Sequence, residues 1–257
     1  MLVVQSPTEM NATFLSDQQY SALHRLLHAL IDQAAARVLV APQADADGFW
    51  FGGGNMVQAE DGSLWLCGRY RNHGDSRTGL EVGTRGLECA LFRSIDGGAS
   101  FQKARHWSKA DLGTAQYEVI SIEGTSLQRL ADGSWELYIS TEKSRAYPAA
   151  AAGFQKPGTG VWSIERLHAR RLDGLDVASL TPVLETDRPE YLHMKDPVTY
   201  ALPGGETALI FCTHPFTWAA SNSGLAVRGA DQAEFTLRNW EVVARGPAWG
   251  CGRHAHH

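Results

Sequence analysis

The chain has 257 residues, of which 44% are hydrophobic, and a formal net charge of −5. This length and apolar content suffice for a sizeable buried core, and the mixed charges without a lysine or arginine block argue against a nucleic-acid partner. No apolar run approaches the about 18 residues of a membrane span, so no membrane partner is expected. The first residues lack the basic and apolar regions of a secretory signal, which predicts a cytoplasmic protein.

An amphipathic helix opens the chain. Ser16 followed by Gln19 forms a capping-box start, and leucines then recur at helical spacing as far as about Ala35. His24 and His28 lie one turn apart but have no third ligand nearby, so we expect no metal and no cofactor. The segment RVLVA, residues 37–41, predicts a short lead-in strand. Residues 1–41 are thus a lead-in, and residues 42–257 form the main domain.

Three similar hairpin sequences follow, and their turns contain Gly62, Gly133 and Gly205. Asp-Gly or Gly-Gly between two alternating runs is a strong hairpin signal, because both turn residues tolerate a positive φ. The turn glycines are 71 and 72 residues apart (62 to 133 and 133 to 205). A period this regular predicts one repeated supersecondary unit.

Each hairpin is followed by a weaker strand–turn–strand echo, so the repeat has about four antiparallel strands, which is the blade of a β-propeller. The predicted fold is therefore all-β, with three four-stranded blades at about 45–107, 119–184 and 192–245. A closed ring of five or six blades needs more, which predicts a partial propeller, either truncated or completed by another chain. Its unclosed sheet face near Trp240 is expected to promote self-association.

The echo after the first hairpin, SIDGGASF, runs from Ser94 to Phe101 and fits the pattern S-x-D-x-G-x-x-F/W. It resembles the Asp-box of sialidases and other BNR-repeat propellers. This resemblance implies a structural role, in which Asp96 ties a turn between outer strands and Phe101 packs between blades.

Three carboxylates lie near the starts of the predicted innermost strands. Glu123 stands ten residues before Gly133, Asp196 stands nine before Gly205, and Asp47 precedes the inner strand of the first blade. Because the innermost strands of a propeller run in one direction beside the central axis, we expect these side chains to meet at one end of the central channel. Two carboxyl groups with different pKa values are the machinery of glycoside hydrolysis.

The segments around these carboxylates, Asp47-Gly48-Phe49, Glu123-Gly124 and Lys195-Asp196-Pro197, resemble the D-P-F, E-G-P and (R/K)-D-P elements of the five-bladed propeller glycoside hydrolases. These are the arabinanase, xylosidase and invertase-like groups. The resemblance implies a glycosidase in which the first aspartate is base or nucleophile, the glutamate is the general acid, and the last aspartate orients the acid. Glycine replaces proline after Asp47, and Glu123 precedes the D-P element, whereas those families usually show the reverse order.

We expect Glu123 to be the acid, because its neighbours Ile122 and Leu127 indicate a dry setting and burial raises the pKa of a carboxyl group. Lys195 is expected to keep Asp196 ionised. The substrate would be a carbohydrate, and loop residues supply candidate binding groups. The candidates are Arg69, Arg71, Asp75, Glu142, Lys195, His214 and Trp218.

Two alternatives stay open. The stretch from Gly52 to Asp75, followed by the SIDGGASF segment, also resembles the opening of sialidases, and Asp75 then takes the place of the acid/base. The arginine of the sialidase R-I-P strand is absent, so Arg69 and Arg71 would have to clamp an acidic sugar. In a non-catalytic carbohydrate-binding propeller, the carboxylates would only form hydrogen bonds with sugar hydroxyls.

Overall fold

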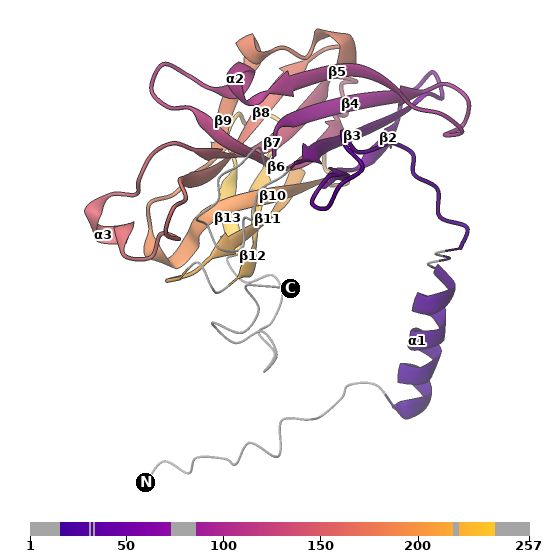
Figure 1. Cartoon of the computed structure of the whole chain (residues 1–257), viewed down its shortest axis with the longest axis horizontal. Coiled ribbons are helices and arrows are strands. Elements are labelled where there is room, and N and C mark those ends of the chain that lie inside the picture. The colour runs from indigo at the N-terminus through magenta and orange to yellow at the C-terminus, as the bar shows by residue number, and fades with distance from the viewer. Residues whose placement is uncertain (1–15, 31, 33, 73–85, 218–220, 240–257) are drawn as a thin grey trace. The chain divides into compact units, whose positions relative to one another are not determined.

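The computed structural model describes residues 16–30, 32, 34–72, 86–217 and 221–239 (Figure 1). By its internal contacts the chain separates into two compact units, residues 1–39 and 40–257. Within the described residues, no helix is both long and apolar enough to cross a membrane.

The first unit contains helix α1 (Asp17–Leu30). The predicted capping box is confirmed, because the Ser16 N–H donates to Gln19 Oε1 at 2.9 Å and the Gln19 N–H donates to Ser16 Oγ at 3.3 Å. The helix ends at Leu30 rather than near Ala35. The lead-in strand predicted at residues 37–41 is wrong: no strand forms there, and Val38 is 79% exposed.

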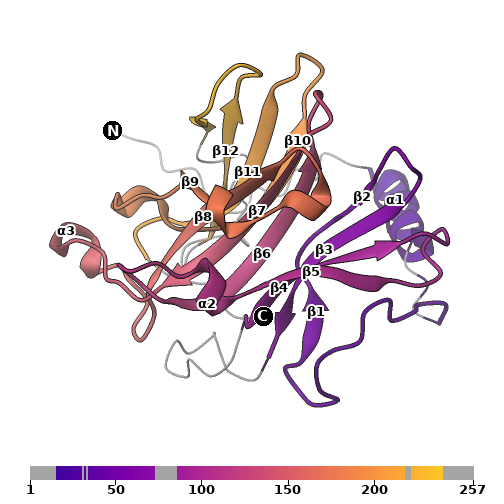
Figure 2. The ribbon, with the colours of Figure 1, turned by 90° about the horizontal axis from the view of Figure 1, so that it is seen from above.

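The second unit consists of three antiparallel sheets, called blades 1 to 3 in chain order (Figure 2). Blade 1 contains β1 (Trp50–Gly52), β2 (Met56–Gln58), β3 (Leu64–Arg71), β4 (Glu88–Ser94) and β5 (Gln102–Ser108). Blade 2 contains β6 (Val119–Arg129), β7 (Trp135–Lys143), β8 (Val161–Ala169) and β9 (Thr181–Leu184). Blade 3 contains β10 (Leu192–Ala201), β11 (Thr207–His214), β12 (Asn222–Arg228) and β13 (Thr236–Asn239). The connections include α2 (Lys109–Leu112), α3 (Ala149–Ala152) and the 3-10 turns Leu172–Gly174, Val177–Ser179 and Pro189–Tyr191.

The predicted repeat is confirmed by three matching hairpin turns. The N–H groups of Gly62, Gly133 and Gly205 each donate at 3.0 Å to the carbonyl three residues earlier. All three glycines have a positive φ, between 80° and 85°, which a residue with a Cβ adopts only at a cost. In blade 1 the inner strand is interrupted after Gly52, so both β1 and β2 pair with β3. Each blade therefore keeps a four-stranded layout.

Contacts between the inner strands repeat at the same spacing as the turns. The Thr125 N–H donates to the Gly53 carbonyl at 2.7 Å, and the Gly124 N–H donates to Asp196 Oδ1 at 3.1 Å, each pair being 72 residues apart (125 − 53 and 196 − 124). Corresponding positions of successive repeats thus touch in space. This is the geometry of a propeller, and the fold of the second unit is a partial β-propeller of three blades.

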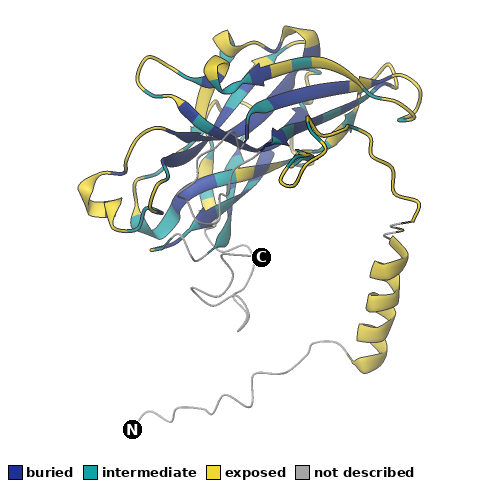
Figure 3. Cartoon of the chain, in the orientation of Figure 1, coloured by how far each residue is buried: buried dark blue, intermediate teal, exposed yellow. Residues whose placement is uncertain are grey.

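The side chains of blade 2 are the most buried, because this blade lies between blades 1 and 3. All nine residues of β7 are buried, because blade 2 has a neighbour on each face (Figure 3). On one face Leu127 and Leu137 belong to an apolar cluster with Trp65 of blade 1. On the other face Tyr138 clusters with Phe211 of blade 3. Fully burying one such side chain contributes about 1.5–3 kcal/mol, so these clusters hold the blades together.

A buried ion pair also joins blades 2 and 3. Both carboxylate oxygens of Glu136 accept hydrogen bonds from Arg228 at 2.7 Å, and the Tyr138 hydroxyl donates to Glu136 Oε2 at 2.6 Å. Arg166 adds a further contact at 2.9 Å. Glu136 thus pairs with two arginines, and removing it would leave uncompensated buried positive charge.

The outer face of blade 3 is covered less than the face toward blade 2. Along β11 buried residues alternate with half-buried ones, and Val198 and Tyr200 of β10 are 45% and 51% exposed. Val198 pairs with Ile210, which pairs with Leu225, so these side chains share one apolar face. Trp240, beside which the unclosed face was predicted, lies outside the described residues.

Self-association through this face stays a prediction. We expect a second copy of the chain to pack on Val198, Tyr200 and Ile210, because contiguous apolar sheet surface is rarely left in water. Sedimentation velocity over a range of concentrations should show reversible association that Tyr200→Lys weakens. A single monomeric species at every concentration would contradict the expectation.

Asp96 ties the turn between β4 and β5, as expected. Its Oδ1 accepts the Ser100 N–H at 3.0 Å and the Ser94 hydroxyl at 2.7 Å, and its Oδ2 accepts the Ser100 hydroxyl at 2.6 Å. Phe101 was expected between blades, but it packs against Tyr70 and Phe92 in an apolar cluster within blade 1. The carboxylate is thus structural, and these contacts say nothing of a kinship with sialidases.

The Asp96 turn makes a prediction about pH. The Ser100 hydroxyl and N–H, followed by the Ser94 hydroxyl, hold the pKa of Asp96 well below its ordinary 3.8. The ionised group therefore stabilises the fold above about pH 4, and this stabilisation is lost as the pH falls towards the lowered value. We expect Asp96→Asn to lower Tm slightly at pH 7 and the difference from wild type to shrink at pH 3. As a control, Asp231→Asn at an exposed position should leave Tm unchanged at both pH values. A Tm difference between Asp96→Asn and wild type that is the same at pH 7 and pH 3 would contradict the structural role of the Asp96 carboxylate.

Candidate functional site

The site is centred on Glu123, which lies where β6 bulges against β7, between Ile122 and Thr125. Glu123 is only 8% exposed. The Ser121 hydroxyl donates to its Oε1 at 2.7 Å, and Arg69 Nη2 of blade 1 lies 3.1 Å from its Oε2. Both carboxylate oxygens therefore have a fixed direction.

The expectation that burial keeps Glu123 protonated is wrong. Burial does raise the pKa of this carboxyl group, but the charges of Arg69 and Lys195 and the Ser121 hydrogen bond together outweigh it, and the pKa lies below its ordinary value of 4.5. The sequence argument considered only the apolar neighbours in β6. The charges come from a different blade and a different strand, which local sequence does not reveal.

Asp196 lies beside Glu123 on the next inner strand. Its Oδ1 accepts the N–H of Gly124 at 3.1 Å, and its own N–H donates to Ser140 Oγ at 3.3 Å. The backbone of Asp196 has a φ of 54°, and the pairing of β10 with β11 shifts register on both sides of Lys195. A non-glycine residue in the left-handed region is strained, and such strain is found at functional sites more often than elsewhere.

Gly124 makes this approach possible. A Cβ built on Gly124 would come within 2.8 Å of Asp196 Oδ1 and 2.9 Å of Asp196 Cα. No side chain fits in that space, so the glycine after Glu123 is required for the two carboxylate-bearing strands to pack this closely. This is a physical reason for a Glu-Gly pair at this position.

Lys195 interacts with both carboxylates. Burial opposes its charge, but Asp196, and to a lesser extent Glu123, raise its pKa above the ordinary 10.5. Its Nζ also lies 5.4 Å from the centre of the Trp162 ring. Two carboxylates and two cations, Arg69 and Lys195, therefore form one charged cluster contributed by all three blades.

An exposed indole covers the Arg69 side of this cluster. The Arg69 guanidinium lies 4.9 Å from the centre of the Trp50 ring, and Trp50 is 41% exposed. Arg69 Nε and Nη1 are buried and have no hydrogen-bond partner among the described residues. Because a buried guanidinium donor without a partner is costly, these two groups are suited to bind oxygen atoms of a ligand.

Aromatic rings lie on the other side of Lys195. The His193 ring contacts Trp162 at 4.9 Å, Tyr147 at 5.2 Å and His214 at 5.7 Å between centroids. Burial lowers the pKa of His193 from 6.5 to about 3, so its imidazole is neutral near pH 7. His193 Nε2 and Trp162 Nε1 are buried, and within the described part of the chain they have no hydrogen-bond partner. Polar atoms of this kind favour an oxygen-rich ligand.

The predicted site residues are only partly brought together. Glu123, Asp196, Lys195 and Arg69 form the cluster, and Arg71 adds positive charge near Glu123. Other candidates lie around it. His214 belongs to the aromatic group, and Glu142, directly across from Ser121 in the sheet, accepts the Gly160 N–H at 2.8 Å. Asp47 lies on an exposed loop before β1 and makes no described contact with Glu123, while Asp75 and Trp218 lie outside the described residues.

Several site residues were missed by the sequence analysis: Trp50, Ser121, Tyr147, Trp162 and His193. Trp50 and Ser121 are two or three residues from predicted carboxylates, so proximity alone was a usable signal. His193 precedes Lys195 by two residues, but its backbone has a strained φ of 59°. The sequence gives no signal for this conformation, so the contact of its side chain with Trp162 could not be predicted. The described residues contain no group of three or more potential metal ligands.

Solved structures share this fold. An endo-arabinase from Bacteroides thetaiotaomicron VPI-5482 is 12% identical with a TM-score of 0.50, and the match covers 81% of this chain and 66% of that one. A thermostable family-43 glycoside hydrolase is 12% identical (TM-score 0.49, 74% and 54% covered), and an inulosucrase from Halalkalicoccus jeotgali bound to kestose is 14% identical (TM-score 0.46, 80% and 56% covered). The chain thus spans between 54% and 66% of these proteins. No protein-family model matches it, and no curated protein does.

The fold is therefore the β-propeller found in glycoside hydrolases such as this endo-arabinase, as the sequence resemblance implied. At 12% identity the likeness concerns the fold alone, and function has to be argued from the site.

The Gly124 contact gives a direct test of the site geometry. We expect Gly124→Ala to push Asp196 out of place and to reduce ligand binding or turnover at least about tenfold, because misplacing a site residue by about 1 Å can cost more than that. Gly153→Ala is the matched control, since a Cβ there meets no atom within 4 Å. Equal function of Gly124→Ala and wild type, with both folded by circular dichroism, would contradict the geometry.

Proposed function

We propose that this chain is a carbohydrate-active enzyme that hydrolyses a glycosidic bond. The observation that carries the proposal is the hydrogen bond from the Gly124 N–H to Asp196 Oδ1, which brings together the inner strands that bear Glu123 and Asp196. Hydrolysis of a glycoside uses two carboxyl groups, one as acid and one as base or nucleophile, and in this proposal Asp47 and Glu123 take these roles. The fold shared with proteins named as glycoside hydrolases supports the proposal without deciding it.

In the proposed mechanism Glu123 acts as the ionised carboxylate. The charges of Arg69 and Lys195 favour its ionised form, which suits a base or nucleophile at the anomeric carbon better than a proton donor. Asp196 orients the sugar through a hydroxyl. The proton donor of the proposal is Asp47, which has no ion pair with any described residue and lies three residues before Trp50, at most about 10 Å of chain. The roles of Glu123 and Asp47 are thereby exchanged relative to the sequence expectation.

The sugar would lie between two aromatic groups. Trp50 offers an exposed face for stacking a sugar ring, and Arg69 Nε and Nη1 offer donors for its oxygens. Trp162 and His193, on the far side of Lys195, offer two further polar atoms without partners. A mostly apolar site with a few converging polar groups is the usual form of a small-ligand site.

Kinetics with two substrates test the roles. An activated aryl glycoside has a leaving group that needs little protonation, whereas a natural oligosaccharide needs a general acid. We expect Glu123→Gln to lower kcat by about 10²–10⁴-fold on both substrates. Asp47→Asn should lose much less activity on the aryl glycoside than on the oligosaccharide.

Glu185→Gln is the matched control, because Glu185 is an exposed glutamate of the same blade paired with Arg145. If instead Glu123→Gln keeps most of its activity on the aryl glycoside and loses it on the oligosaccharide, Glu123 would be the general acid, as the sequence predicted. A chain that turns over neither substrate but loses sugar binding in Glu123→Gln would be a non-catalytic carbohydrate-binding propeller. The buried Arg69–Glu123 ion pair is the observation that favours this second candidate, since it engages one carboxylate oxygen.

A further inference from the structure

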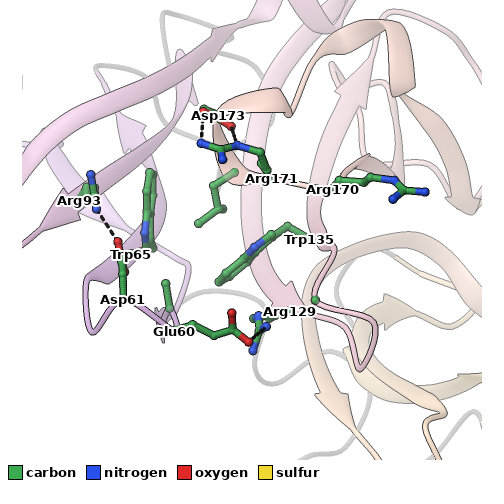
Figure 4. A pocket seen from close by; sticks show the side chains of 12 residues that line it. Glu60, Asp61, Trp65, Arg93, Arg129, Trp135, Arg170, Arg171 and Asp173 are labelled. Carbon is green, nitrogen blue, oxygen red and sulfur yellow. Dashed lines mark hydrogen bonds and ion pairs between the residues drawn. The ribbon is translucent and has the colours of Figure 1, made fainter.

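A cavity of about 390 Å³ lies between blades 1 and 2, far from the Glu123 cluster. Trp65 of blade 1 and Trp135 of blade 2 lie on its two sides (Figure 4), and Leu172 also lines it. Its volume falls within the range of about 300–1,000 Å³ of small-ligand pockets. The mechanism proposed above makes no use of it.

The cavity and the Glu123 cluster lie at different points along β3 and β6. In β3, Trp65 is the second residue and Arg69 the sixth; in β6, Glu123 is the fifth residue and Arg129, which lines the cavity, is the last. Four to six residues of strand correspond to about 13–20 Å. A ligand in the cavity would therefore not compete with one at Glu123.

Both indoles follow a hairpin turn, Trp65 three residues after Gly62 and Trp135 two residues after Gly133. In one turn Ser63 donates its hydroxyl to Asp61 Oδ1 at 2.5 Å and accepts the Trp65 indole N–H at 3.0 Å. In the other, Ser134 donates its hydroxyl to Asp132 Oδ1 at 2.6 Å. These bonds fix both turns, so the walls of the cavity are preformed and binding costs little ordering.

The rim of the cavity carries paired charges. Arg93 binds Asp61 at 2.7 Å, Arg171 binds Asp173 at 2.9 Å, and Arg129 pairs with Glu60. With Arg170 the lining has four arginines against these three carboxylates, so the charge is nearly balanced. Each pair is exposed and worth about 0–1 kcal/mol, so it can open at little cost towards a ligand.

This combination suits one ligand chemistry. A sugar hydroxyl both donates and accepts hydrogen bonds, so a rim of alternating guanidinium and carboxylate groups can bind several hydroxyls at once. The floor is formed by Trp65, Trp135 and Leu172, which are 9%, 6% and 7% exposed, so it offers a narrow apolar strip to the C–H groups at one edge of a sugar ring. An anion would gain an excess of only one arginine over the three carboxylates, and an apolar ligand would leave the charged groups of the rim without hydrogen-bond partners from the ligand.

We propose that this cavity is a second carbohydrate site, which binds a neutral oligosaccharide segment away from the Glu123 cluster. The inference rests on the proposed function for its substrate class, since it assigns the cavity to another part of the same carbohydrate. Holding a long chain at two places raises the effective concentration of its scissile segment. Small substrates that reach only the Glu123 cluster gain nothing from it.

The test uses the Glu123→Gln variant of the full chain, so that no sugar is consumed. Indole N–H signals of Trp65 and Trp135, assigned by NMR through Trp65→Phe and Trp135→Phe, are followed during titration with arabino-, xylo- and fructo-oligosaccharides. We expect saturable shifts of both signals with at least one neutral series. Adding Arg93→Ala and Arg129→Ala should weaken this binding at least about tenfold, whereas Lys103→Ala with Arg145→Ala, which removes two ion pairs outside the cavity, should not.

Activity separates this inference from the proposed function. On the wild-type background, Arg93→Ala with Arg129→Ala should leave turnover of a small aryl glycoside unchanged and reduce turnover of a soluble polysaccharide. Indole shifts in a chain that hydrolyses nothing would refute the proposed function and leave the second site standing. The second site is refuted if no neutral sugar shifts the two signals, if the arginine variants bind as tightly as the parent, or if only acidic oligosaccharides bind.

Discussion

The close approach of the inner strands is the constraint on which the rest of the structure depends. Gly124 and Asp196 lie so near that a single added carbon would collide with the carboxylate, and Thr125 is held to Gly53 by a 2.7 Å hydrogen bond. Each contact joins positions 72 residues apart. The repeat therefore places equivalent residues of successive blades around one axis, and the charged side chains there are neighbours because the backbones are.

The fold could be predicted to a large extent from the turns. Gly62, Gly133 and Gly205 mark a period that no other architecture explains as simply, and the glycine requirement at a positive φ is local chemistry. The prediction of a short strand at residues 37–41 was wrong, because a β-strand needs a second strand that pairs with its backbone N–H and C=O groups. An alternation of apolar residues does not reveal whether such a strand is present. Likewise the Glu136–Arg228 pair joins residues 92 apart, which only the packing of blades 2 and 3 brings together.

The site could be predicted as a set of positions but not as an electrostatic environment. Glu123 and Asp196 were found because they precede turn glycines by nearly the same number of residues. The lowered pKa of Glu123 depends on Arg69, which comes from blade 1, and on Lys195, which a register shift in β10 brings close. Apolar neighbours in sequence indicate burial correctly, yet burial decides the pKa of a carboxyl group only when no cation is buried with it.

A crystal structure of the Glu123→Gln chain with a bound neutral oligosaccharide tests the central claim most directly. We expect a sugar ring against Trp50, with its oxygens within hydrogen-bond distance of Arg69 and the side chains of residue 123 and Asp196 facing it from adjacent strands. The carboxyl positions of residue 123 and Asp47, which the mechanism makes base or nucleophile and acid, should lie about 5–5.5 Å or about 6.5–9.5 Å apart, the separations of retaining and inverting glycosidases. A sugar bound only elsewhere, or residue 123 and Asp196 facing separate spaces, would contradict a single site at the propeller axis.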